Sequence, residues 1–296
     1  RGGLGEGSSG TPPLNLSRFF AGARHREMST LLDGQVPGAR DKLLASANAA
    51  LEGRLDLLGY SGLVVGDPVD WHSDPTTGHR APLVHWSRLD PLNPKMVGDS
   101  KAVWELNRHQ WLVQLAQTYR LTGDERYAQS VASHLTRWMV DNRPGIGINW
   151  TSSLEAGLRL MSWCWLLALL DGSTALTPDL VRAMRRALVA HAIHVERYLS
   201  YYFSPNTHLT GEALGLVYAG TLFPEMPHAT RWREIGTRFL LDELARQVLP
   251  DGVYFEQATC YQRYTVDIYL HLLVLGRQGG LALPDAVREG IERMLE

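Results

Sequence analysis

The segment "WLVQLAQTYRLTGDERYAQSVASHLTRWMV", residues 111–140, decides the fold class of this chain. Apolar residues recur every three or four positions on both sides of the turn "TGDERY", as they do on the buried face of a helix. Asp124, within that turn, is a suitable N-cap. The segment therefore predicts a hairpin of two helices, over 99–121 and 125–140.

The rest of the chain repeats this pattern, and strand-like alternation is nearly absent. Pro178 and Pro284 stand where a first helical turn accepts proline. Further helices are predicted over 150–170, 178–201, 209–222, 230–249, 256–278 and 284–296. Successive helices with short links lie antiparallel, which predicts an all-α fold: a bundle, a superhelical solenoid or a closed α/α toroid. No fixed-period repeat is visible, which disfavours the solenoid.

Three regions differ in composition. Residues 1–17 are rich in Gly, Ser and Pro and are expected to be flexible. Residues 18–98 are expected to combine N-terminal helices with a long loop, and residues 99–296 to form the α/α domain. The chain has no initiator Met and stops within a helical pattern at Glu296, so we expect the polypeptide to continue and the helical domain to be truncated there.

The N-terminal region predicts one helix over 40–58, followed by an irregular stretch, 59–98, that is dense in Pro, Gly, Asp and His. A loop of that length in a compact domain is often functional. Short strands are expected within it, around Leu63–Val65 and Leu83–Trp86.

Composition argues against several classes of function. The 296 residues carry a net charge of −2, so charge gives no case for nucleic acid or an anionic membrane surface as partner. The richest apolar run, residues 160–170, is too short to span a membrane. Cys164 and Cys260 have no metal-type spacing and suggest no disulfide framework. No Gly-rich phosphate loop, GxSxG elbow or HExxH motif is present, and neither a metal nor a cofactor is predicted.

Four helix starts combine aromatic residues with Asn, His, Glu, Gln or Arg. Aromatic faces stack on the C–H faces of sugars, whose hydroxyls need hydrogen-bonding partners. In a toroid, helix ends from distant parts of the sequence meet around one cleft. The four clusters are "KAVWELNRHQW" (101–111), "NWTSSLEAGLRLMSW" (149–163), "SPNTHLTGEALGL" (204–216) and "DGVYFEQATCYQRY" (251–264).

The third cluster places Asn206, His208 and Glu212 at the mouth of an otherwise apolar helix. His208 and Glu212 are four residues apart and share a helix face, so Glu212 could hold the imidazole in one tautomer. Two other interpretations stay open. Either Asn206 or Thr207 is a simple N-cap and His208 a surface group, or the His–Glu pair contributes to a metal site, for which one pair is weak support.

The fourth cluster carries a polar stripe on an otherwise apolar helix. Gln257, Tyr261 and either Tyr264 or Thr265 share one helical face, and Glu256 stands at its start. A tyrosine in such a place can donate or accept a proton if nearby cations lower its pKa. The alternative is that Tyr261 is an amphipathic core residue with its hydroxyl at the rim.

The second cluster contains Glu155 and Arg159, again four residues apart, and Trp150 precedes them. The pair is either a helix-stabilising ion pair or an arginine aimed at a substrate carboxylate, and the spacing fits both.

The first cluster supplies Trp104, Asn107, Arg108 and His109 as candidate substrate-binding residues. They lie on more than one helical face, so some of them must pack in the core.

Taken in order, the four clusters resemble the heparinase II/III-like family of polysaccharide lyases. The resemblance covers about residues 101–278, and the ordered set of motifs is more specific than any one of them. The matching text is "WELNRHQWLVQLAQTYRLTGDERYA", "NWTSSLEAGLRLMSW", "SPNTHLTGEALGLVYAGTLFPE" and "DGVYFEQATCYQRYTVDIYLHLL".

The resemblance implies an α/α toroid followed by a β-sandwich domain, which is expected downstream of this chain. It also implies β-elimination by an Asn and a His of the third motif and a Tyr of the fourth, which fall on Asn206, His208 and Tyr261. Several members have the Asn and His adjacent, whereas here Thr207 lies between them, so either Asn206 or Thr207 fills the amide's place. A further His contributed by the β-sandwich has no counterpart here, so the fragment alone is expected to be incomplete.

The prediction is a lyase that cleaves an anionic, uronate-containing polysaccharide of glycosaminoglycan, alginate or exopolysaccharide type. Two alternatives remain: an α/α-toroid glycoside hydrolase using carboxylates from among Glu155, Glu212 and Glu256, and a non-catalytic polysaccharide-binding protein. The resemblance is compatible with a periplasmic or secreted location, which the sequence itself leaves open. The sequence identifies neither the polysaccharide nor the oligomeric state.

Overall fold

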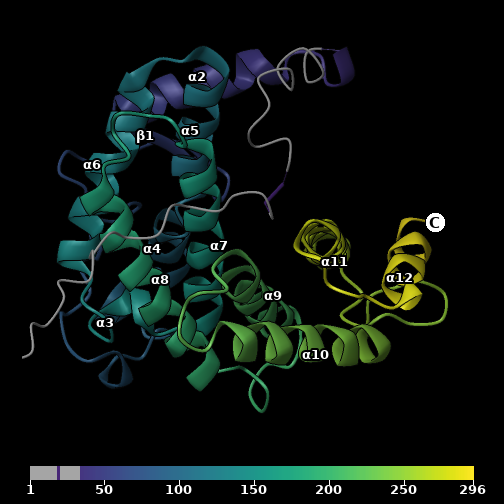
Figure 1. Ribbon diagram of the computed structural model, residues 1–296. Coiled ribbons are helices and arrows are strands. Elements are labelled where there is room, and N and C mark those ends of the chain that lie inside the picture. Colours follow the sequence, from purple (N-terminus) through teal and green to yellow (C-terminus); the bar gives the residue numbers. More distant parts are fainter. Residues whose placement is uncertain (1–18, 21–33) are drawn as a thin grey trace, which may run out of the picture.

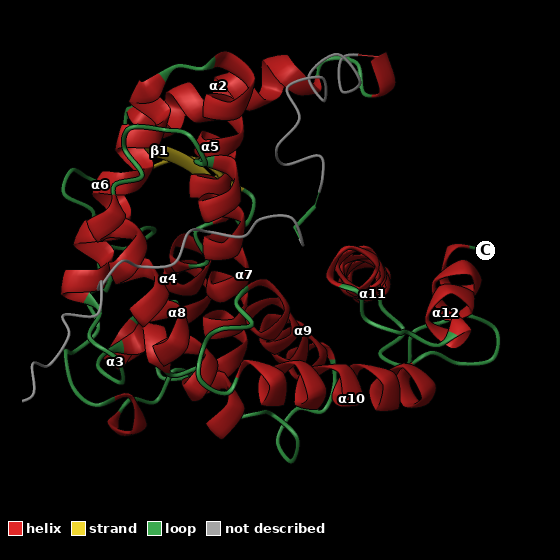
Figure 2. Cartoon of the chain, in the orientation of Figure 1, coloured by secondary structure: helices red, strands yellow, loops and turns green. Residues whose placement is uncertain are grey.

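A computed structural model describes residues 19–20 and 34–296. The predicted flexible segment, residues 1–17, lies outside the described residues. Figures 1 and 2 show a mainly helical chain. Its small sheet consists of two strands. The elements are α2 (Ala39–Leu51), β1 (Arg54–Leu57), β2 (Tyr60–Val64), η3 (Trp86–Arg88), α3 (Pro94–Val97), α4 (Ser100–Asn107), α5 (Gln110–Thr122), α6 (Glu125–Asp141), η4 (Ile148–Trp150), α7 (Ser153–Leu169), α8 (Pro178–Arg197), α9 (Thr207–Leu222), α10 (Ala229–Gln247), α11 (Thr259–Gly279) and α12 (Asp285–Leu295).

The helical hairpin predicted from residues 111–140 is confirmed as α5 and α6. Gly123, with a φ of 74°, ends α5. The Asp124 carboxylate then caps α6 by accepting a hydrogen bond from the Arg126 N–H at 3.0 Å. The turn therefore works as its sequence suggests, because glycine tolerates positive φ and aspartate satisfies a free helical N–H.

The single helix predicted over 99–121 is wrong, because the chain forms two helices there, α4 and α5. His109 separates them in a left-handed conformation with a φ of 63°. This conformation aims the fully buried His109 ring at α7, where its Nδ1 accepts a hydrogen bond from Trp163 Nε1 at 2.8 Å. A tertiary contact thus outweighs the local preference for one continuous helix.

The N-terminal region also differs from its prediction. The helix expected over 40–58 ends at Leu51, and β1 follows it. Leu58 and Gly59, with φ of 52° and 85°, turn the chain so that β1 and β2 pair antiparallel. β2 includes Leu63, close to the strand expected there. The strand expected at Leu83–Trp86 is wrong: among the described residues, only a single bridge to Ile146 forms in that stretch.

Two helix ends shift in a way that matters for the site. α7 begins at Ser153 instead of Trp150, and α8 ends at Arg197 instead of Tyr201. Of the residues left outside the two helices by these shifts, all except Tyr201 line the cleft described below. The start of α11 moves similarly, from the predicted residue 256 to Thr259.

Helix α9 is the central element, packed between α7 and α10. A Cβ on Gly215 of α9 would lie 3.1 Å from the Cα and the carbonyl oxygen of Gly157 on α7. A Cβ on Gly236 of α10 would lie 2.4 Å from the carbonyl oxygen of Ala213. These glycines allow three helix backbones to approach closely. Every α9 residue except His208 is therefore buried, which accounts for its largely apolar sequence.

The antiparallel helices form an open arc, an incomplete α/α toroid, that runs from α2, α5 and α6 through α7, α9 and α10 to α11 and α12 (Figure 1). Residues of α4 and the first turns of α7, α9 and α11 all contribute to one cleft, as the clusters predicted. Among the helices that the structure describes, none combines the length and apolar character needed to cross a bilayer.

Candidate active site

The four clusters meet at a cleft of about 1020 Å³. Of the twelve site residues predicted from the sequence, six line it: Trp104, Arg108, Trp150, Asn206, His208 and Tyr261. The other lining residues are Leu58, Trp86, Asp90, Pro91, Leu92, Lys101, Glu105, Thr151, Ser152, Ser153, Leu154, Glu155, His194, Tyr198, Leu199, Ser200, Phe203, Thr207, Cys260 and Tyr264.

Asn206 connects the third cluster to the fourth. It is the N-cap of α9, where its Oδ1 accepts a hydrogen bond from the His208 N–H at 3.0 Å. Its Nδ2 donates to Glu256 Oε1 at 3.1 Å. The capping interpretation is therefore correct for Asn206, and Thr207 is buried behind it with 4% exposure. A cap also leaves the Asn206 amide facing the cleft, so the two roles do not conflict.

The His208 ring is half-buried at the mouth of α9. Burial lowers its pKa, while the nearby Glu155 and Glu256 carboxylates act in the opposite direction and the Arg108 cation adds to the lowering. The imidazole is consequently neutral at neutral pH. A neutral imidazole can donate a hydrogen bond from one ring nitrogen and accept one at the other.

Glu212 does not hold His208 as the spacing suggested. Its carboxylate instead accepts hydrogen bonds from the Ser200 N–H at 2.7 Å and from the Ser200 hydroxyl at 2.6 Å. Burial raises the pKa of Glu212 to about 7, and those two bonds partly oppose the shift. Glu212 therefore lies behind the cleft wall and fixes the loop between α8 and α9.

Two tyrosines of α11 line the cleft. Tyr261 lines the cleft with 44% of its surface exposed. The Tyr264 hydroxyl is buried and has no hydrogen-bond partner among the described residues, and burial raises the pKa of Tyr264 to about 12. Gln257 and Thr265, which share the predicted stripe, are not lining residues: Gln257 is exposed elsewhere and Thr265 is buried.

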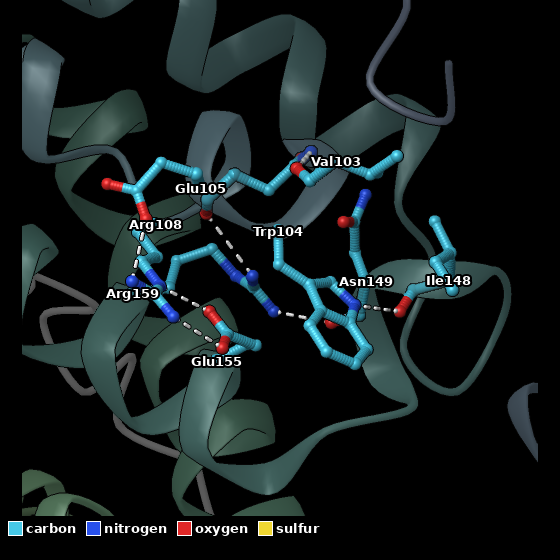
Figure 3. Close-up of polar contacts among 9 residues, drawn as sticks. Val103, Trp104, Glu105, Arg108, Ile148, Asn149, Glu155 and Arg159 are labelled. Carbon is cyan, nitrogen blue, oxygen red and sulfur yellow. Dashed lines mark hydrogen bonds and ion pairs between the residues drawn. The ribbon is translucent and has the colours of Figure 1, made fainter. Parts of the chain in front are cut away.

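Arg108 is a cation in the lining of the cleft. Its Nε and Nη2 donate to Glu155 at 2.6 and 2.8 Å, and its Nη1 donates to Glu105 at 2.7 Å (Figure 3). These partners raise the pKa of Arg108 further, so the guanidinium stays charged at any accessible pH. The i,i+4 ion pair expected between Glu155 and Arg159 does not form, because Glu155 turns to Arg108 instead.

Arg159 lies beneath the cleft with no exposed surface. Its Nε donates to His191 Nε2 at 2.8 Å, and its Nη1 and Nη2 donate to the carbonyl oxygens of Asn107 and Asn149 at 3.2 and 2.8 Å. Its guanidinium also lies 4.6 Å from the ring centre of Trp138. The Arg159 guanidinium is thus hydrogen-bonded to groups inside the protein. Arg108 lines the cleft in the place expected for Arg159.

The first cluster divides between wall and core. Trp104 lies on the wall and donates from Nε1 to the Ile148 carbonyl at 3.1 Å (Figure 3). Asn107 is fully buried, and its Nδ2 donates to the carbonyl oxygens of Trp71 and Val103 at 3.0 and 2.8 Å. Asn107 and His109, two of the four candidate residues of this cluster, are therefore buried beneath the cleft wall and do not line the cleft.

Sequence reasoning missed the contribution of the loop between α8 and α9. Tyr198, Ser200 and Phe203 line the cleft from residues that were predicted to be helical or to be a plain link. Tyr202 and Phe203 are 94% and 87% exposed. The consecutive aromatic residues before "SPNTH" were the available signal, since a contiguous exposed apolar patch, unlike a single exposed residue, often marks an interaction site.

Comparison with known proteins places this geometry in context. A sequence profile described as "Heparinase II/III N-terminus" matches residues 39–296. A heparin-sulfate lyase of Bacteroides stercoris is 25% identical in an alignment of 309 positions that covers 96% of this chain and 40% of that protein. A heparin-sulfate lyase of Bacteroides thetaiotaomicron is 30% identical over 198 residues, which cover 65% of this chain and 28% of that protein. The chain therefore spans less than half the length of these relatives.

The fold has counterparts among solved structures. The crystal structure of the heparan sulfate lyase HepC from Pedobacter heparinus superposes with a TM-score of 0.66. The match covers 91% of this chain and 41% of that one, at 23% sequence identity. At 23% sequence identity, this structural similarity shows that the two chains share the helical fold.

Proposed function

Since the chain belongs to the family described as the heparinase II/III N-terminus, we propose that the complete protein cleaves a uronate-containing polysaccharide by β-elimination. The observation that carries the proposal is the meeting of Asn206, His208 and Tyr261 at one cleft beside Arg108. These four side chains supply the donors, the cation and the acid–base group that this reaction requires.

β-Elimination removes the proton at C5 of a uronate and expels the sugar linked at C4. As the proton leaves, enolate-like negative charge develops on the C6 carboxylate. Hydrogen-bond donors aimed at this carboxylate stabilise the transition state more than the ground state, so they accelerate proton removal.

Asn206 and His208 are suited to receive the carboxylate. One N–H of the Asn206 amide reaches Glu256, which leaves its second N–H for a substrate oxygen. The neutral His208 ring donates from its protonated nitrogen. Both residues stand at the start of α9, a helix of 16 residues, whose dipole adds positive potential there.

Arg108 supplies the fixed positive charge in this proposal. Glu105 and Glu155 occupy three of its N–H groups, and a guanidinium has five. The remaining two can face the C6 carboxylate, in the part first assigned to Arg159. Trp104 and Trp150 offer aromatic surface along the same wall.

Tyr261 is the proposed acid–base group. Its phenolate oxygen takes the C5 proton, and the resulting hydroxyl returns that proton to the departing O4 when both lie on the same side of the sugar. The C4–O4 bond breaks and a C4=C5 double bond forms, so the electron pair of the C–H bond is accounted for and no water is consumed.

A hydrolase would need two available carboxylates flanking the bond. Glu155 forms an ion pair with Arg108, and Glu212 is buried and hydrogen-bonded to Ser200. Glu256 accepts a hydrogen bond from the Asn206 side-chain amide. None of the three carboxylates considered from the sequence supports that alternative.

The test is ultraviolet absorbance of the C4=C5 double bond during incubation of the complete protein with a panel of uronate polysaccharides. Growth of absorbance with one substrate supports elimination and identifies the substrate. Release of reducing ends without absorbance would replace the proposal by hydrolysis, and binding without cleavage would replace it by a binding function.

A further inference from the structure

We infer that Arg159 is a positioning residue, a buried guanidinium that holds the peptide units before Arg108 and Trp150 so that these two residues line the cleft. The inference rests on the proposed function, because it concerns residues that would receive the substrate. It is carried by one geometric fact: a single planar group binds three separate segments of the chain behind the cleft wall.

Arg159 itself is out of reach of a ligand. Its side chain has no exposed surface, and it does not line the cleft. In the part of the chain that the structure describes, no carboxylate forms an ion pair with it; its partners are two carbonyl oxygens and an imidazole. A buried cation without a counter-charge is costly, so these hydrogen bonds must be formed for the folded chain to hold it.

Two of these hydrogen bonds act directly on the cleft wall. Nη1 donates to the carbonyl oxygen of Asn107 at 3.2 Å, at the end of α4, where a helical carbonyl lacks a partner within its own helix. Nη2 donates to the carbonyl oxygen of Asn149 at 2.8 Å (Figure 3). A carbonyl shares one rigid plane with the next residue's N–H. Arg159 therefore orients the peptide units that lead into Arg108 and Trp150.

The third hydrogen bond ties the same guanidinium to α8. Arg159 Nε donates to His191 Nε2 at 2.8 Å, and His191 Nδ1 lies 2.7 Å from the Ala187 carbonyl oxygen. That oxygen can only accept, so Nδ1 carries the proton and Nε2 is free to accept. Burial and the Arg159 charge lower the pKa of His191, which keeps the ring neutral. His191 stands three residues before His194, which lines the cleft.

The two peptide units held by Arg159 are also tied to each other. The side-chain Nδ2 atoms of Asn107 and Asn149 both donate to the Trp71 carbonyl oxygen, at 3.0 and 2.9 Å. A shift of one segment is therefore passed to the other. The end of α4 and the turn η4 form one braced unit behind the wall.

The guanidinium also contacts aromatic rings. It lies 4.6 Å from the ring centre of Trp138 and 5.9 Å from that of Trp150. A cation near an aromatic face is attracted by the ring. Arg159 thus acts on the side chain of Trp150 as well as on its backbone. A lysine would keep the charge but not the planar fork that binds three acceptors at once.

Kinetics of the complete protein in the absorbance assay provide the first test, at a temperature where each variant is fully folded. Arg159→Met should lower kcat/KM about 10²-fold, since small displacements of binding groups have effects of that size. Arg159→Lys should remain at least about tenfold below the parent, because the fork is lost. A lysine variant with parental kcat/KM would overturn the inference.

Arg185→Met is the matched control. Arg185 is another internal arginine, with a side chain 12% exposed, and its ion-pair partner is Glu225. Neither residue lines the cleft. Its replacement should leave kcat/KM within about twofold of the parent, as expected for an independent site. Equal losses in Arg159→Met and Arg185→Met would overturn the inference.

A double-mutant cycle shows whether Arg159 acts through Arg108. If it does, adding Arg159→Met to Arg108→Ala should lower kcat/KM by no more than about tenfold further, although the same change costs about 10²-fold in the parent. A general structural role would instead multiply the two losses in full, and that result would contradict positioning of Arg108.

Amide hydrogen exchange tests the same idea without turnover. In Arg159→Met, exchange in segments 105–111 and 147–152 should accelerate at least about tenfold, since the brace that closes them is lost. Arg185→Met should leave both segments unchanged. His191→Leu removes one hydrogen bond and should accelerate exchange in the same segments to a smaller degree, whereas His191→Gln, which keeps an acceptor, should resemble the parent.

The lysine and histidine variants keep the inference testable if Arg159→Met does not fold. Parental exchange in both segments would overturn it. Elimination by the parent together with parental kcat/KM in the folded Arg159 variants would refute the inference and leave the proposed function standing. Accelerated exchange in both segments, in a protein whose parent shows no elimination, would refute the proposed function and keep Arg159 as the residue that positions the wall.

Discussion

Arg108 and Glu155 form a bidentate ion pair that joins the end of α4 to the first turn of α7, with N···O distances of 2.6 and 2.8 Å. The Glu155 side chain is 3% exposed and that of Arg108 is 26% exposed. Two parallel hydrogen bonds fix the plane of the guanidinium as well as its position. The pair therefore determines which N–H groups of Arg108 remain directed at the cleft.

Breaking this pair should cost stability as well as activity. Arg108→Ala leaves the Glu155 carboxylate buried without its counter-charge, and we expect a loss of about 2–3 kcal/mol in the free energy of unfolding. This lies slightly below the usual cost of breaking a buried pair, because Arg108 is partly exposed. Denaturant unfolding measures the loss. The double variant Arg108→Ala/Glu155→Gln should recover part of it, and an additive loss would contradict the pairing.

Tyr261→Phe should abolish turnover and largely preserve binding. Removing the acid–base hydroxyl is expected to lower kcat by about 10²–10⁴-fold, the usual range for general acid–base catalysis. The Kd for substrate should change little, since the ring remains. Single-turnover absorbance and calorimetry on the complete protein separate the two effects. A variant with kcat within tenfold of the parent would remove Tyr261 from the proposed role.

Tyr264→Phe tests the second tyrosine of the cleft. Within the part of the chain that the structure describes, the Tyr264 hydroxyl is buried without a partner, and its pKa is raised to about 12, so it stays protonated. Deleting an unsatisfied buried hydroxyl should leave thermal stability unchanged or raise it by up to about 1 kcal/mol. A loss of stability would mean that the hydroxyl has a partner in the folded protein. Weaker substrate binding at unchanged stability would identify the substrate as that partner.

Glu212 should make the protein less stable as the pH rises toward neutrality. Its pKa is about 7 when folded, against an ordinary value of 4.5. Between these values the folded chain binds more protons than the unfolded chain, so the free energy of unfolding falls as the pH rises. Relative to Glu212→Gln, the parent should lose up to about 3 kcal/mol between about pH 5 and pH 8. Parallel stability profiles for the two proteins would contradict the raised pKa.

The sequence predicted the site better where it marked helix starts than where it paired residues by spacing. Asn206, His208 and Tyr261 reach one cleft because helix boundaries are encoded locally, by caps and turns. The pairing of Glu155 failed because i,i+4 spacing identifies neighbours on one helix but not a stronger partner on another. Arg108 is 47 residues away in sequence, and only packing brings it close.

The same distinction explains the misassigned helices. His109 interrupts a helical pattern because its partner, Trp163, lies 54 residues later. The loop between α8 and α9 reads as helix up to Tyr201, yet α8 ends at Arg197 and Ser200 binds Glu212 instead. Local propensity is a weak prior that such tertiary contacts override.

The spacing of α7 and α9 links packing to function, and two glycines allow it to be tested. A Cβ on Gly215 would lie 3.1 Å from the Gly157 backbone, which is rigid, whereas a Cβ on Gly157 would lie no closer than 3.4 Å to α9. We expect Gly215→Ala to push α9 away from α7 and to cost about 1–3 kcal/mol. Gly157→Ala should be neutral or gain up to about 1 kcal/mol, since alanine favours the helix.

The displacement should also reach the cleft, because α9 carries His208 and α7 carries Glu155, the partner of Arg108. Gly215→Ala should therefore lower kcat/KM in the absorbance assay at temperatures where the variant remains fully folded, while Gly157→Ala should not. Unfolding measurements and kinetics on the same two variants provide the check. If both alanines proved equally stable and equally active, close packing of α7 on α9 would not be what positions the donors at the mouth of α9.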